Sequence, residues 1–314
     1  MSKEYLKSLV QTAKEQDYTW SLYFFKISHQ KKGNPYYVYK IKFKNVTYLP
    51  QYAKSLCDFV SKYQIDPLEN VHDYDGMNSK TSCDKIKVNN ELISEQWNYF
   101  FTSVTNAARE EVKGNYQGYI LDGQPVHEED KPITFVKIGN PIIKIENNKS
   151  VVFRHVENVE LEQFSDDLCR LYLSTDFLVI EDTLYSFNLA FEGIFEMEKT
   201  MRRLKDIAID KIIETNAFYE VEKVTSFMKS YTSPKTFLTL KQQRLDKLNT
   251  LEGRSEIANR LQLSTKDSAE IIIDTQEKAN QLIKYLCYKI FQDKETDNLI
   301  EVNSVLNDNV LRRK

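Results

Sequence analysis

The segment from residue 176 to residue 206 limits the possible folds of this chain more than any other. Two short apolar runs, residues 177–180 and 184–187, are separated by Glu181-Asp182, which has the length of a tight hairpin turn. From about Asn188 onward, the apolar residues change to helical spacing. The pattern therefore predicts a β-hairpin that leads directly into an amphipathic helix, and this helix is expected to pack on the hairpin.

The composition is that of a folded protein rather than a disordered one. Of the 314 residues, 41% are hydrophobic and 28% are charged, and the low numbers of Gly (8) and Pro (7) favour long helices. We predict an α/β protein of the α+β type with two domains. Residues 1–150 form a strand-rich N-terminal α/β domain with antiparallel hairpins, and residues 151–314 combine a hairpin with mostly helical structure.

Local patterns predict individual elements in both halves. Ser2 caps a first helix, and the glycine-containing turn at residues 32–35 joins strands 20–28 and 36–48. Periodic apolar residues predict the remaining elements: helices from Pro50 to about Tyr63, 90–112 and 276–292, and strands 133–138, 142–145 and 151–156.

The cysteines and the apolar runs indicate the compartment. Cys57, Cys169 and Cys287 have apolar neighbours and no paired spacing, so we interpret them as reduced core thiols. Neither an export signal nor an apolar run of about 18 residues is evident. We therefore expect a cytoplasmic protein that needs a partner to reach a membrane.

Positive charge is concentrated near the N-terminus. No acidic residue lies between Asp17 and Asp58. On the predicted strand 36–48, Lys40, Lys42 and Lys44 alternate, so they share one face and lie about 7 Å apart. This spacing resembles that of phosphates along a nucleic acid, although lysines on a solvated or protected sheet edge have the same pattern. The candidate DNA-binding residues are Lys26, Lys31, Lys32, Lys40, Lys42, Lys44, Arg202 and Arg203.

Negative charge is concentrated farther along the chain. From His155 to Glu198 there are eleven carboxylates and a single base, Arg170. We predict that Glu157, Glu160 and Glu162 bind a partner protein, and the alternative is an ordinary solvated surface.

No sequence pattern indicates an enzymatic reaction. His72-Asp73-x-Asp75 and the acidic stretch from Asp122 to Asp130 lack the spacing that would direct ligands at one metal ion. Glu129-Asp130-Lys131 with Asp122 imitates a metal-dependent nuclease, but the run is short and is followed by Pro132. Nucleophile elbows and glycine-rich phosphate loops are also missing. We therefore predict no catalytic residues, no metal and no cofactor.

The hairpin segment resembles the DUF4868 family. That family has an acidic turn, a Tyr-x-Phe-Asn strand end and a Phe-Glu-x-Ile-Phe helix start, and the matching residues here are Asp182, Tyr185, Phe187, Asn188, Phe191, Glu192, Ile194 and Phe195. The resemblance extends over residues 150–310. Chain length and the strand-rich first half look most like the KwaB-like members, which belong to the Kiwa antiphage system.

The resemblance implies a function that the residues alone do not give. It implies an antiphage defence effector that binds phage DNA non-catalytically, blocks its replication or expression, and works with a KwaA-like multi-pass membrane protein. We expect a homodimer on double-stranded DNA, held peripherally at the inner membrane by that partner. Two alternatives remain open: a metal-dependent nuclease with an unrecognised site, and an adaptor that binds only proteins.

Overall fold

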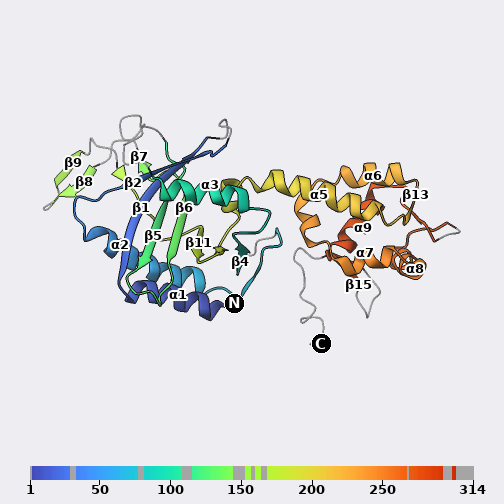
Figure 1. Ribbon diagram of the computed structural model, residues 1–314, viewed down its shortest axis with the longest axis horizontal. Coiled ribbons are helices and arrows are strands. Elements are labelled where there is room, and N and C mark those ends of the chain that lie inside the picture. Colours follow the sequence, from blue (N-terminus) through green and yellow to red (C-terminus); the bar gives the residue numbers. More distant parts are fainter. Residues whose placement is uncertain are drawn as a thin grey trace. The chain divides into compact units, whose positions relative to one another are not determined.

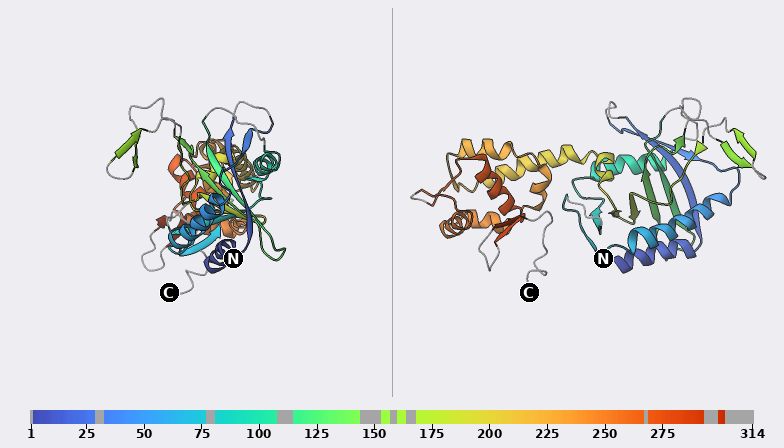
Figure 2. Two further views of the ribbon diagram at one scale, coloured as in Figure 1. Left: turned by 90° about the vertical axis from the view of Figure 1, so that its left-hand side faces the viewer. Right: turned by 180° about the vertical axis from the view of Figure 1, so that it is seen from behind.

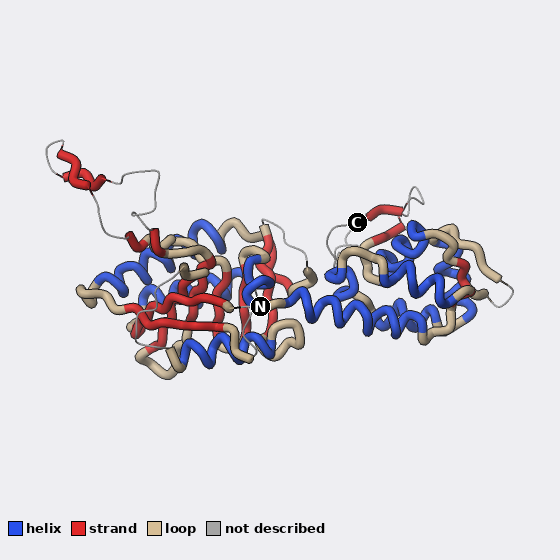
Figure 3. Tube along the Cα trace, turned by 90° about the horizontal axis from the view of Figure 1, so that it is seen from above, coloured by secondary structure: helices blue, strands red, loops and turns tan. Residues whose placement is uncertain are grey.

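The chain forms two compact units, which are described separately below. The computed structural model describes residues 2–28, 33–76, 81–107, 115–143, 153–156, 160–163, 168–266, 269–292 and 299–301. Unit 1 comprises Met1–Asp73 with Asn78–Phe195, and unit 2 comprises Tyr74–Met77 with Glu196–Lys314. Figure 3 shows that strands predominate in unit 1 and helices in unit 2.

Unit 1 contains one large sheet and several helices. Its helical segments are α1 (Lys3–Glu15), α2 (Tyr48–Phe59), a π-helical turn (Val60–Ile65), α3 (Ser94–Thr105) and α4 (Ala190–Ile194). Its strands are β1 (Tyr18–Ile27), β2 (Tyr36–Ile41), β3 (Asn70–Asp73), β4 (Ser82–Lys87), β5 (Gly118–Pro125), β6 (Ile133–Ile138), β7 (Ile142–Ile143), β8 (Phe153–Val156), β9 (Glu160–Gln163), β10 (Leu168–Cys169), β11 (Phe177–Ile180) and β12 (Thr183–Ser186).

The large sheet has eight strands in the order β2-β1-β5-β6-β11-β12-β4-β3. All neighbouring pairs are antiparallel except β3 and β4, which are parallel. The predicted fold class is therefore confirmed. The Ser2 cap is confirmed as well, because its side chain accepts a hydrogen bond from the Tyr5 N–H at the start of α1.

Helices cover both faces of the sheet (Figure 1). On one face, side chains of α1 and α2 pack with Leu121, Phe135 and Leu178 from three neighbouring strands. On the other face, the Phe100 ring of α3 lies 5.4 Å from the Phe25 ring of β1 and 5.1 Å from the Tyr36 ring of β2, measured between centroids. The central strands β5, β6, β11 and β12 are consequently buried on both faces along much of their length.

The segment after the hairpin packs as predicted. Phe191, Ile194 and Phe195 are buried, with exposed fractions of 0%, 4% and 1%. The helical segment is nevertheless two helices rather than one, because Glu196 adopts a left-handed backbone with φ 47° between α4 and α5. This break separates unit 1 from unit 2.

The two units divide later in the chain than the boundary that we predicted near residue 150. The β11–β12 hairpin pairs with β6 on one side and with β4 on the other, so it lies inside the sheet of unit 1. Most residues around the predicted boundary, 144–152, lie outside the described part of the chain.

Unit 2 is built around α9. Its helical segments are α5 (Met197–Ile213), α6 (Val221–Lys229), a 3-10 turn (Pro234–Thr239), α7 (Gln242–Leu248), α8 (Leu251–Arg260) and α9 (Gln276–Leu286). Its strands are β13 (Phe218–Tyr219), β14 (Ile271–Ile272), β15 (Ile290–Gln292) and β16 (Leu299–Glu301). Side chains of α5 to α9 share one buried cluster, and Figure 2 shows α9 among the other helices.

Two sequence predictions about the second half of the chain were wrong in detail. The last helix ends at Leu286 rather than at residue 292, because Tyr288 is left-handed (φ 57°) and the next residues pair as β15 with β16. Cys169 is exposed, because β10 and β7 form a separate two-stranded pairing. Cys57 and Cys287 are buried as predicted, and burial raises the pKa of each thiol to about 12.

The packing of Phe195 generates a test of the fold. Its ring centroid lies 5.7 Å from that of Trp97 and 5.9 Å from those of Phe100 and Phe177. We expect Phe195→Ala to lower the free energy of unfolding by about 3–5 kcal/mol, because it leaves a cavity among these rings. Chemical denaturation measures this change. Val126→Ala, at a position 61% exposed, is the control and should change stability by no more than about 0.5 kcal/mol.

Candidate nucleic-acid interface

The pairing of β1 with β2 places the predicted basic residues on different faces of the sheet. Lys40 pairs with Tyr23, and Lys26 pairs with Tyr37, in the antiparallel register. Paired residues project to the same face, and neighbours along a strand project to opposite faces. Lys40 therefore lies on the face that α3 covers, whereas Lys26 lies on the face of Phe24 and Tyr39. The candidate lysines do not form one continuous row.

The second strand is shorter than predicted. It ends at Ile41, so Lys42 and Lys44 follow the strand rather than belonging to it. The Asn45 side chain accepts hydrogen bonds from the backbone N–H (2.9 Å) and the hydroxyl (2.8 Å) of Thr47. This turn redirects the chain into α2, and such competition by Asn ends regular pairing.

Exposure still alternates through this segment, as the sequence predicted. Lys40, Lys42 and Lys44 are exposed, whereas Ile41 and Phe43 pack against the cluster of Leu22, Phe24 and Tyr119. The apolar residues hold the segment on the sheet, and the lysines consequently face solvent.

These lysines lack acidic neighbours. Within the described part of the chain, Lys40, Lys42 and Lys44 have no ion-pair partner, and the Nζ of Lys40 lies 5.6 Å from the centroid of the Tyr23 ring. Other lysines of unit 1 are paired: Lys7 with Asp66 at 2.6 Å, and Lys14 with Asp58 at 2.7 Å. The lysine segment, defined here as Lys40, Lys42 and Lys44, therefore keeps its positive charge available to a ligand.

The other predicted site residues are less informative. Lys31, Lys32 and Glu157 lie outside the described residues, and Glu160 and Glu162 belong to β9. Arg202 and Arg203 lie on α5 of unit 2, where Arg202 forms an exposed ion pair with Glu198 at 2.6 Å.

The acidic motifs do not assemble a metal site in the described residues, where no group of three or more His, Cys, Asp and Glu could hold an ion. The Nδ1 of His72 lies 3.2 Å from the buried carboxylate of Asp84. Lys131 of the nuclease-like run forms an ion pair with Glu181 at 2.9 Å. Asp122 accepts a hydrogen bond from Thr134 at 2.8 Å.

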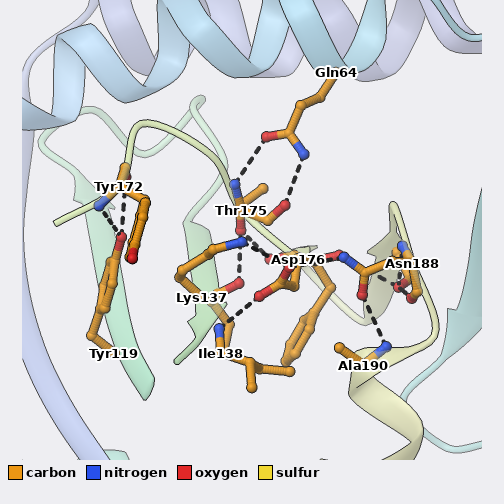
Figure 4. A network of polar contacts seen from close by, with 12 residues as sticks. Gln64, Tyr119, Lys137, Ile138, Tyr172, Thr175, Asp176, Asn188 and Ala190 are labelled. Atoms are coloured by element: carbon orange, nitrogen blue, oxygen red, sulfur yellow. Dashed lines mark hydrogen bonds and ion pairs between the residues drawn. The ribbon is translucent and has the colours of Figure 1, made fainter. Parts of the chain in front are cut away.

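Asn188, one of the family-like residues of the hairpin segment, contacts the buried carboxylate of Asp176 (Figure 4). This side chain forms an ion pair with Lys137 at 2.9 Å and accepts hydrogen bonds from the Ile138 N–H at 2.7 Å and the Asn188 amide at 2.8 Å. The Asn188 side chain also accepts a hydrogen bond from the Ala190 N–H at the start of α4. These contacts join β6, β11 and α4.

Two further contacts fix the segment that precedes Asp176 (Figure 4). Gln64 and Thr175 exchange two hydrogen bonds of 2.8 Å and 2.9 Å. The hydroxyl of Tyr119 accepts from the Tyr172 N–H at 2.7 Å and donates to its carbonyl at 3.0 Å. Burial raises the pKa of Tyr119 to about 12, so this hydroxyl keeps its proton at neutral pH.

A second group of cations lies beside tyrosines, and the sequence reasoning missed all of it except Lys26. The Nζ of Lys26 is 5.6 Å from the centroid of the Tyr39 ring and 5.7 Å from that of Tyr116. Lys137 and Arg170 lie 5.9 Å and 5.0 Å from the centroid of the Tyr172 ring. Lys26 is far in sequence from Tyr116, as Lys137 is from Tyr172, so these contacts could be found only from the fold.

The comparisons with known proteins give the family. The profile described as "Kiwa protein KwaB-like" matches residues 125–292, which is more than half of the chain. The chain belongs to the KwaB-like family. Membership implies a role in Kiwa antiphage defence, in a system with other subunits that include KwaA.

Neither the curated proteins nor the solved structures contain a match. Among the helices that the structure describes, none is both long and apolar enough to cross a bilayer.

The Asp176 contacts generate a stability prediction with an internal control. We expect Asp176→Ala to lower the free energy of unfolding by on the order of 3–5 kcal/mol, because Lys137 and two other donors lose their shared acceptor. Asp182 pairs with Lys87 at 2.6 Å, but both side chains are 59% exposed. Asp182→Ala should therefore cost less than about 1 kcal/mol. Equal losses in urea denaturation would contradict the assignment.

Proposed function

We propose that this chain is an antiphage defence effector that binds double-stranded DNA through the lysine segment and does not cleave it. The observation that carries this proposal is the exposure of Lys40, Lys42 and Lys44 in a stretch without acidic residues. Bound protein would block replication or expression of the phage DNA.

The chemistry of lysine indicates the kind of recognition. An ammonium group acts as a mobile point charge toward phosphate and does not read a base edge in a fixed geometry. Binding should therefore depend little on sequence and should release counterions, so that affinity falls steeply with salt.

A membrane-embedded partner completes the proposal. KwaB-like membership supports the presence of KwaA, and we propose that this subunit holds the chain, as a homodimer, at the inner membrane. The acid-rich residues Glu157, Glu160 and Glu162 would face cytoplasmic loops of KwaA, since such loops are enriched in Lys and Arg.

The lysine segment is tested by charge reversal. We expect the triple variant Lys40→Glu, Lys42→Glu, Lys44→Glu to lose retardation of duplex DNA while its melting temperature changes by only a few degrees, because exposed lysines contribute little to stability. Titration of labelled duplex measures binding, and the wild-type log–log salt dependence should have a slope of about −0.9 per neutralised phosphate.

The matched control reverses three other exposed lysines, Lys62, Lys211 and Lys229, and changes the net charge by the same amount. It should keep its affinity for DNA. If both triple variants bind as the wild type does, the lysine segment is not the DNA site. Cleavage of the duplex when Mg²⁺ is added would support the nuclease alternative, and neither retardation nor cleavage would support the adaptor.

Fractionation tests the membrane arrangement. The chain expressed alone should remain in the supernatant, and co-expression with KwaA should move it to the membrane pellet. Arg substitutions at Glu157, Glu160 and Glu162 should return it to the supernatant without changing its affinity for DNA. Pelleting without KwaA, or no pelleting with it, would exclude this arrangement.

A further inference from the structure

Two exposed tyrosines, Tyr37 and Tyr172, and the cations near them form a second surface on the Lys26 face, with a different chemistry from the lysine segment. The strand register joins its parts, because Tyr39 pairs with Phe24, Phe24 with Tyr119, and Tyr119 with Lys137. These four residues form one row across β2, β1, β5 and β6, and Tyr39, Phe24 and Tyr119 within it are buried. At the usual strand spacing, the row spans about 14 Å.

Exposed rings lie at both ends of this row. Tyr37 is the neighbour of Lys26 across the strand pair and is 38% exposed. Tyr172 is 36% exposed, and its backbone is fixed by the Tyr119 hydroxyl and by the Tyr52 hydroxyl, which donates to its carbonyl at 2.7 Å. The backbone of Tyr172 is thus anchored to the sheet (Figure 4), and Tyr37 is held within β2.

The charge of this surface is positive. Lys26 is the cross-strand neighbour of Tyr37, and its Nζ lies 5.6 Å from the buried Tyr39 ring. Arg170 lies beside the Tyr172 ring and has no ion-pair partner in the described part of the chain. The carboxylate of Asp176 is engaged by Lys137 and by two hydrogen-bond donors.

Exposed rings beside cations suit unpaired bases. Single-stranded nucleic acid offers base faces for stacking and phosphates for ion pairing, whereas the bases of a duplex are already stacked on one another. We infer that this surface binds single-stranded nucleic acid, with bases on Tyr37 and Tyr172 and phosphates at Lys26 and Arg170. The inference deepens the proposed nucleic-acid function but depends on other residues than the lysine segment.

Three labelled probes of equal length test the inference: a mixed-sequence single strand, an abasic single strand and a duplex. Fluorescence anisotropy of the unaltered protein should show that the natural single strand binds at least about tenfold more tightly than the abasic strand, because stacking needs bases. Equal affinity for these two strands would overturn the inference, and this comparison requires no variant.

Substitutions locate the site. The double variant Tyr37→Ala, Tyr172→Ala should lose at least about tenfold in affinity for the natural single strand, and Tyr37→Phe, Tyr172→Phe should retain it because the rings remain. The matched control is Tyr63→Ala, since Tyr63 is 56% exposed and lies 5.0 Å from the Nζ of Lys62. If the double Ala variant binds the single strand as tightly as this control, the surface is wrongly assigned.

The duplex separates this inference from the proposed function. If the wild-type protein binds the duplex but binds the natural and the abasic single strands equally well, only the stacking surface is contradicted. If the protein binds the single strand, loses that binding in the double Ala variant and does not bind the duplex, only the proposal for the lysine segment is contradicted. Failure to bind any of the three probes would contradict both.

Discussion

The buried carboxylate of Asp176 is the constraint on which the arrangement of unit 1 depends. An acid with only 7% exposure is costly unless donors surround it, and here the donors come from β6 and from the segment after β12. The Asp176 side chain thereby joins the start of β11 to β6, and through Asn188 it fixes the start of α4. Because the β11–β12 hairpin is interior to the sheet, β6 and β4 depend on its position.

The period of two along each strand then determines on which face of the sheet each cation lies. Lys26 and Lys40 both belong to the acid-free stretch, yet the register of β1 with β2 sends them to opposite faces. The face that α3 covers carries Lys40, which belongs to the lysine segment without acidic neighbours. The other carries rings that are held by Tyr119 and by cations. The first set of groups suits the regular phosphates of a duplex, and the second suits splayed bases.

Local signals predicted the parts of this fold that depend on neighbours in sequence. The Ser2 cap, the β11–β12 hairpin and the burial of Phe195 follow from short patterns. The end of β2 was missed because the Asn45 turn competes with continued alternation. The end of α9 was missed because apolar spacing continues through Ile290, although Tyr288 is left-handed. The ring surface could not be predicted, since the contacts of Lys26 with Tyr116 and of Tyr119 with Tyr172 join distant parts of the sequence.

The family match includes only part of the proposed binding residues. It spans residues 125–292, so it includes Arg170 and Tyr172 but leaves Lys26, Tyr37 and the lysine segment outside. KwaB-like membership therefore lends the lysine segment no support, and duplex binding there rests on the charge and exposure of this chain's own residues. The match also includes the hairpin segment, and more than half of its length lies in unit 2. Asp176, Asn188 and Phe195 keep the sheet and α4 together, and this packing fixes the positions from which any ligand is contacted.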